Sequence, residues 1–151
     1  MPVTEAALAF PAAPQSAGAA RRFVRHRVDD WHLGVATDDV VLMVSELVTN
    51  VGRHARTEAT VRVRFAGDCL RIEVSDASPQ PVQRREHSSG AEAGRGLLIV
   101  DALAAAWGVE ADDHGKTVWF EVPATRLASS GRDGSEPRRG GGRPAEPQSS
   151  A

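Results

Sequence analysis

A carboxylate and a carboxamide stand four residues apart, Glu46 and Asn50, in the segment SELVTNVGRHA. In a helix this spacing places both side chains on one face. An amide oxygen can ligate a hard cation such as Mg²⁺, and a carboxylate can orient or deprotonate a nucleophile. The pair therefore suits a magnesium–nucleotide site, but the same spacing also describes two solvated side chains on an amphipathic helix.

Two other segments carry groups that a ligand could use. Asp76 directly follows the alternating residues 70–74, and an acid at a strand end often caps a turn. Gly94-Arg95-Gly96 precedes the apolar run LLIVDALA. Its backbone amides could approach an anion at a helix N-terminus, or its glycines could form a hinge. Neither segment identifies a function by itself.

The segment Gly115-Lys116-Thr117 resembles the end of a phosphate-binding P-loop but does not meet the requirements of that motif. A P-loop needs another glycine five positions before Gly115, and Glu110 stands there. It also needs a helix afterwards, whereas VWFEV alternates as a strand. A P-loop is therefore excluded.

The spacing of apolar residues predicts the elements that would position these groups. Apolar residues recur at helical intervals from about Ala17 to Trp31 and again from Thr37, which is expected to be an N-cap. The second helix would carry Glu46 and Asn50, and residues 96–106 would form a third. The expected buried stripe of the second helix is Val40, Val44, Leu47, Val48, Val51 and Ala55.

Elsewhere the apolar period falls to two, which predicts two hairpins. The first joins residues 60–65 to 70–74 through a turn at Gly67-Asp68, and the second joins residues 107–111 to 118–122. Residues 79–94 have no period and are expected to form a long loop. This order of elements predicts an α+β fold, with helices on one face of a mainly antiparallel sheet.

Four of these segments, in this order, resemble the conserved boxes of the GHKL ATPases, the superfamily of gyrase, histidine kinases and MutL. They are SELVTNVGRHA, VSDASPQP, GRGLLIVDALA and GKTVWFEV, within about residues 21–122. Within the superfamily, the chain looks most like small bacterial regulators similar to anti-sigma-factor serine/threonine kinases. The resemblance implies a Bergerat-type two-layer α/β sandwich with a mixed, mainly antiparallel sheet, and it implies ATP and Mg²⁺ as cofactors.

The resemblance also implies roles for individual residues. Glu46 matches the general base, Asn50 the magnesium ligand within the ATP site, and Asp76 the acceptor for the adenine amino group. The other implied ATP contacts lie near the phosphates, the base or the end of a lid, and they are Arg53, His54, Gly94, Arg95, Gly96, Leu97 and Thr117.

One residue inside the predicted site helix is unfavourable there. Gly52 follows Asn50 by two positions, and glycine in a helix costs about 1 kcal/mol relative to alanine. We expect it to loosen the helix just beyond Asn50, which affects the contacts of Arg53 and His54.

Three functions are open. A serine/threonine protein kinase would transfer the γ-phosphoryl group of ATP to a protein similar to an anti-sigma-factor antagonist, with Mg²⁺ on Asn50 and Glu46 as the base. A binding module would use ATP as a structural ligand and sequester a sigma factor or another regulator. The third function is ATP hydrolysis without a protein acceptor. The presence of Glu46 favours the kinase, and the resemblance also allows a homodimer.

Composition limits the partners and the location. Residues 1–125 carry 13 Arg/Lys against 17 Asp/Glu, so we expect no basic face for nucleic-acid phosphates. The single cysteine excludes an internal disulfide. No apolar stretch approaches the roughly 20 residues that span a bilayer, and no secretory signal is visible, so we expect a cytoplasmic protein.

Composition also sets the expected domain limits. Residues 15–126 are expected to form the ATP-binding domain, and residues 1–14 to be disordered or to add an edge strand. Residues 127–151, rich in Gly, Pro and Arg, are expected to be a disordered tail because they contain little to bury.

Overall fold

The apolar alternation along the chain produces a five-stranded sheet in the computed structural model, which describes residues 4–77 and 91–128. The order across this sheet is β1-β3-β4-β6-β5, and every neighbouring pair is antiparallel. The strands are β1 (Thr4–Phe10), β3 (Ala59–Ala66), β4 (Cys69–Asp76), β5 (Ala106–Asp112) and β6 (Gly115–Pro123). A separate small sheet pairs β2 (Leu33–Gly34) with β7 (Thr125–Arg126).

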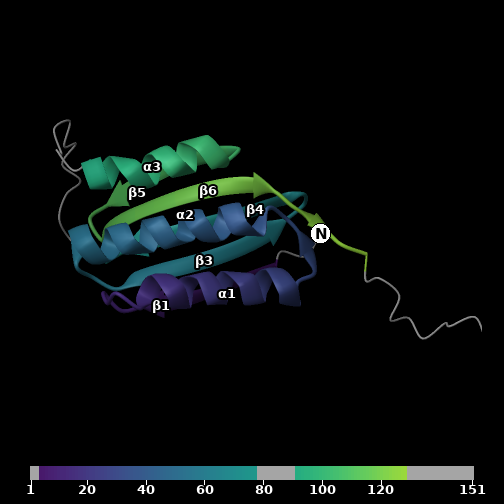
Figure 1. Cartoon of the computed structure of the whole chain (residues 1–151), viewed down its shortest axis with the longest axis horizontal. Coiled ribbons are helices and arrows are strands. Elements are labelled where there is room, and N and C mark those ends of the chain that lie inside the picture. The colour runs from purple at the N-terminus through teal and green to yellow at the C-terminus, as the bar shows by residue number, and fades with distance from the viewer. Residues whose placement is uncertain (1–3, 78–90, 129–151) are drawn as a thin grey trace, which may run out of the picture.

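Three helices lie side by side on one face of the large sheet (Figure 1). They are α1 (Ser16–Asp30), α2 (Thr37–Asn50) and α3 (Ala91–Leu103), and α2 lies between the other two. A π-helical turn, η1 (Val51–Ala55), continues α2. The predicted two-layer α+β sandwich is confirmed, with a sheet that is antiparallel throughout. No helix in the described part of the chain is long and apolar enough to cross a bilayer.

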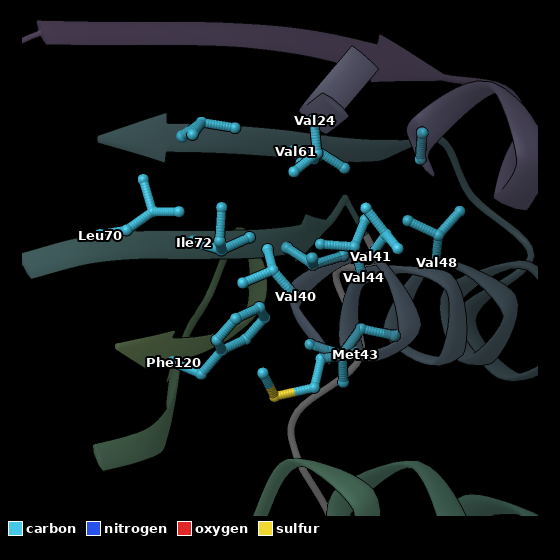
Figure 2. Close-up of a cluster of buried hydrophobic side chains, with 14 of the residues drawn as sticks. Val24, Val40, Val41, Met43, Val44, Val48, Val61, Leu70, Ile72 and Phe120 are labelled. Atoms are coloured by element: carbon cyan, nitrogen blue, oxygen red, sulfur yellow. The ribbon is translucent and has the colours of Figure 1, made fainter. Parts of the chain in front are cut away.

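The core lies between the sheet and the helices (Figure 2). Val63, Ile72 and Phe120 stand side by side across β3, β4 and β6, and none of them exposes any surface. Helix α2 supplies most of the opposing side chains. Its buried residues are Val40, Val41, Met43, Val44, Leu47 and Val48. Four residues of the predicted stripe are therefore confirmed on α2, and the structure adds Val41 and Met43. The other two lie on the π-helical turn, where Val51 is buried and Ala55 only partly so.

The edge strand that the sequence allowed for residues 1–14 is present, because Thr4–Phe10 pairs with β3 along its whole length. Two predicted helix starts differ from the structure. Thr37 is not an N-cap: Ala36 holds that position, and the Thr37 hydroxyl donates to the Val35 carbonyl at 3.3 Å. Helix α3 begins at Ala91 instead of residue 96, since its first residues, AEA, favour helix. Most of the predicted loop and tail, at 78–90 and 129–151, lies outside the described residues.

The outer face of the sheet carries charged side chains that pair with one another. Arg62 lies 2.7 Å from Glu5 and 3.7 Å from Glu73, and Arg71 lies 3.4 Å from Glu73 and 3.6 Å from Glu121. These contacts neutralise the charges along the middle of that face. The chemically distinctive groups are instead found where the helices end against the sheet.

A single methylene removed from the core should have a measurable effect. Ile72→Val is expected to lower the free energy of unfolding by about 1 kcal/mol, because Ile72 is fully buried between β3 and β6. Leu98→Ala on α3 is the control, since Leu98 is 70% exposed and should change stability by less than about 0.5 kcal/mol. Urea unfolding followed by circular dichroism measures both, and equal losses would contradict the assigned core.

Candidate functional site

Glu46 and Asn50 lie where α3 packs against α2. A Cβ atom added to Gly96 of α3 would lie 2.5 Å from Asn50 Nδ2 and 3.7 Å from Glu46 Cβ. A side chain at Gly96 would have to displace the Asn50 amide, so the glycine lets α3 approach the pair without moving it. Leu97, the next residue, packs partly buried against the core and anchors this part of the helix. The structure thus brings together three of the predicted site residues, Glu46, Asn50 and Gly96, with Leu97 next to them in sequence.

Arg95 adds a positive charge at the same place. Its Nη2 lies 3.9 Å from Glu46 Oε1. The Arg95 side chain is 73% exposed and that of Glu46 22%, so the guanidinium reaches a partly buried carboxylate from solvent. Such an exposed pair contributes little to stability, about 0–1 kcal/mol. Because the pair is weak, Arg95 can turn away from Glu46 toward a bound anion. Gly94, the remaining residue of this predicted segment, lies within the first turn of α3.

Asp76 is the last residue of β4 and is held there from two sides. Its Oδ1 accepts a hydrogen bond from the backbone N–H of Lys116 on β6 at 3.1 Å. The N–H of the following residue, Ala77, donates to Thr57 Oγ1 at 3.2 Å. Thr57 lies just after η1 and just before β3. The end of β4 is therefore tied both to β6 and to the segment that leaves α2.

The helix that carries Glu46 changes form immediately beyond the site. Its last turn is the π-helical η1, which contains Gly52, Arg53 and His54 and ends at Arg56 with a left-handed φ of 54°. This change agrees with the loosening expected of Gly52, and π-helical turns often occur at functional sites. The side chains of Arg53 and His54 are exposed, and Arg53 borders a cavity of about 350 Å³ between η1 and the segment preceding α1.

The structure does not place Thr117 beside Asp76. Its Oγ1 lies 2.8 Å from Ser75 Oγ on β4. Because side chains alternate along a strand, Thr117 lies on the outer face, opposite to the buried Val118. The residue of β6 that shares a face with Val118 at this end is Lys116, the only lysine of the chain.

Sequence reasoning did not assign Thr57, Gly115 or Lys116 to this site. Their contacts with the end of β4 join residues that are 20 and 40 positions apart, which no local pattern reveals. The sequence could have indicated the position of Lys116 alone. It stands two residues before Val118 in an alternating strand, so the two share one face of the sheet.

The oxygen atoms at this site suit a magnesium ion bound together with phosphates. Within residues 4–77 and 91–128, no group of three or more His, Cys, Asp or Glu side chains could hold a metal. Asn50 and the adjacent Glu46 offer hard oxygen donors. Mg²⁺ is usually held by one or two protein oxygens, together with waters and substrate phosphates. The donor set therefore fits Mg²⁺ brought with a nucleotide.

The single thiol of the chain takes no part in this chemistry. Cys69 lies at the other end of β4 and donates to Glu121 Oε2 at 3.0 Å. Burial, together with the hydrogen bond to the Glu121 carboxylate, raises the pKa of Cys69 to about 11. The thiol is therefore protonated at neutral pH, and a thiolate nucleophile is not available from it.

The contact between Gly96 and Asn50 predicts different effects for two glycine substitutions. Gly52→Ala should raise the free energy of unfolding by about 0.5–1 kcal/mol, because a Cβ there meets no atom within 4 Å and alanine favours helix. Gly96→Ala should gain less or lose stability, since its Cβ must displace the Asn50 amide. Urea unfolding and the Asn50 side-chain amide resonances measure this. Equal gains in stability for the two variants, with the Asn50 resonances unchanged, would contradict the packing of Gly96 against Asn50.

Comparison with known proteins agrees with this geometry. Among solved structures, the fold is similar to the crystal structure of the RsbU and RsbW domains of Rv1364c from Mycobacterium tuberculosis, at 20% sequence identity and a TM-score of 0.60. The similarity covers 83% of this chain and 33% of that chain, so this chain spans about a third of its length. A search of curated proteins finds no match. Residues 10–122 match the model of the histidine kinase-like ATPase domain, and the chain therefore belongs to that family.

Proposed function

We propose that this chain binds ATP with Mg²⁺ where α2 and α3 meet the ends of β4 and β6, and transfers the γ-phosphoryl group to a protein hydroxyl. The observation that carries the proposal is the packing of α3 at Gly96 onto Glu46 and Asn50. It places a carboxylate and a carboxamide under a helix that also presents Arg95. Membership of an ATPase-domain family supports ATP as the ligand.

The adenine base is assigned to Asp76. Its Oδ1 already accepts the Lys116 N–H, which fixes the carboxylate at the strand end. A carboxylate accepts several hydrogen bonds, so it can also accept one from the adenine amino group. This contact distinguishes adenine from bases that present an acceptor at the same position.

The phosphates are assigned to the junction between α2 and α3. Asn50 would supply an amide oxygen to Mg²⁺, and the ion would neutralise charge on the phosphates. Arg95, largely exposed and only loosely paired with Glu46, is positioned to turn toward the γ-phosphate. Arg53 and His54 follow on η1 directly after Asn50, with exposed side chains, and are assigned to the same ligand.

Glu46 is the general base in this proposal. The attacking hydroxyl oxygen forms a bond to the γ-phosphorus while the bond from that phosphorus to the β–γ bridging oxygen breaks, and ADP leaves. Glu46 accepts the hydroxyl proton. The remaining catalysis comes from positioning and charge neutralisation, as is usual in phosphoryl transfer.

One contact favours a second function. In this structure Arg95 Nη2 lies 3.9 Å from Glu46 Oε1, and a carboxylate that faces a guanidinium is less free to turn toward an attacking hydroxyl. In that case ATP would be a structural ligand, and the protein would hold a partner without phosphorylating it. The sequence boxes, which resemble those of anti-sigma-factor kinases, support a sigma factor or an antagonist protein as the partner in either function. They also support a homodimer.

Asp76→Asn tests the adenine contact. The Asn oxygen can keep the Lys116 hydrogen bond, but its NH₂ group then faces the adenine NH₂, at a cost of roughly 1–3 kcal/mol, or about 5- to 150-fold in affinity. Asp68→Asn, the same change at the exposed hairpin turn before β4, should leave ATP affinity unchanged. Calorimetric titration measures both. Equal affinities would remove Asp76 from the site, and no ATP binding by the parent would reject the ATP site altogether.

Glu46→Gln and Asn50→Ala separate transfer from binding. Loss of a general base usually lowers the rate about 10²- to 10⁴-fold, so Glu46→Gln should lose transfer while ATP affinity stays within a few-fold. Asn50→Ala should instead weaken the magnesium-dependent part of binding. Glu5→Gln on β1 is the matched control, because Glu5 is exposed and pairs with Arg62 on the outer face of the sheet, away from α2 (Figure 1).

The assay follows labelled γ-phosphate onto proteins that co-purify with the tagged chain. If the parent labels no partner yet retains one only when ATP is present, the binding function replaces the kinase. If Glu46→Gln transfers label as fast as the parent, Glu46 is not the base.

A further inference from the structure

The backbone of β6 approaches Asp76 more closely than any residue with a side chain allows. Gly115, the first residue of β6, has a φ of 149°, in the region that favours glycine. A Cβ atom added there would lie 2.2 Å from the carbonyl oxygen of Asp76 and 3.2 Å from its Oδ1. Both Asp76 atoms would have to move to accommodate it. The approach of β6 at this point therefore depends on glycine.

This close approach is what delivers the Lys116 N–H to the carboxylate. Lys116 is the next residue, and its N–H donates to Asp76 Oδ1 at 3.1 Å. An aspartate side chain has two rotatable bonds, and a hydrogen bond to one oxygen removes most of that freedom before a ligand arrives. The β6 backbone therefore helps to orient the Asp76 carboxylate.

The orientation of the Asp76 carboxylate affects which nucleotide base it accepts. Adenine presents an amino donor where guanine presents the carbonyl acceptor O6. A fixed carboxylate accepts from adenine and faces the guanine oxygen acceptor to acceptor, which leaves buried groups unsatisfied. A carboxylate free to rotate loses part of the adenine bond and also escapes the repulsion from guanine.

We propose that Gly115 is a positioning residue that sets base selectivity, by allowing the Lys116 N–H to lock the Asp76 carboxylate. The inference rests on the proposed adenine contact of Asp76. It extends that proposal by naming the origin of the preference for adenine over guanine. Gly115 itself touches no part of the nucleotide in this account. Its effect reaches the base only through Asp76.

The test compares Gly115→Ala with Gly67→Ala. Gly67 is the matched control because its φ of 64° also disfavours alanine, while a Cβ there meets no atom within 4 Å and lies in the turn at the opposite end of β4. Calorimetric titrations with ATP and with GTP give the selectivity, and thermal unfolding without nucleotide gives the stability. Both variants should lose stability, since both place alanine at a positive φ.

Only Gly115→Ala should change selectivity. We expect its ATP affinity to fall about tenfold and its ATP-to-GTP preference to fall by a similar factor, whereas Gly67→Ala should keep both within about threefold of the parent. A Gly115→Ala variant that loses ATP and GTP affinity equally, or neither, overturns the proposal.

A second measurement tests the orienting bond without nucleotide. The Lys116 amide should exchange slowly with deuterium in the parent chain and about tenfold faster in Asp76→Ala, because its acceptor has been removed. An unchanged exchange rate overturns the proposal even if Gly115→Ala fails to fold. If the parent binds no ATP, the proposed function fails, while this exchange result still decides whether β6 orients Asp76.

Discussion

Two close approaches of a glycine to a polar residue hold the candidate site together, one to the Asn50 side chain and one to the Asp76 backbone carbonyl. At Gly96 the backbone of α3 rests on Asn50, and at Gly115 the backbone of β6 rests on Asp76. In each case a Cβ atom would meet the polar residue at 2.5 Å or less. The positions of the assigned phosphate and adenine contacts therefore depend on glycines in elements other than those that carry the contacts themselves.

The scaffold explains how these approaches are sustained. Helix α2 is buried against the sheet by its apolar side, so Glu46 and Asn50 are held on a fixed support next to α3. The antiparallel pairing of β4 with β6 places Ser75 opposite Thr117, and this register sets Asp76 against the start of β6. Sites built on helices and strands hold their geometry better than sites on loops. The π-helical turn after Asn50 is the local departure from this regular support.

The sequence predicted what depends on local periodicity and missed what depends on register between distant segments. The buried stripe of α2, both hairpins and the pairing of Glu46 with Asn50 on one face follow from spacing along the chain. Whether Lys116 meets Asp76 depends on the register of strands 40 residues apart. The face of Thr117 was predictable in principle, because it adjoins the buried Val118 in an alternating strand. The strand at Thr4–Phe10 gave a weak signal because it lies at the sheet edge and keeps Ala7, Leu8 and Ala9 exposed.

The most direct test of the account is an amide-resolved NMR titration of the parent chain with ATP and Mg²⁺. The largest shifts are expected on Gly96 of α3, on Ala77 just after β4 and on Lys116 of β6, which surround the site. The small β2–β7 sheet should remain unperturbed and serves as the internal reference. ATP binding with its largest shifts at β2 and β7, or elsewhere away from Asn50 and Asp76, would contradict the proposed site.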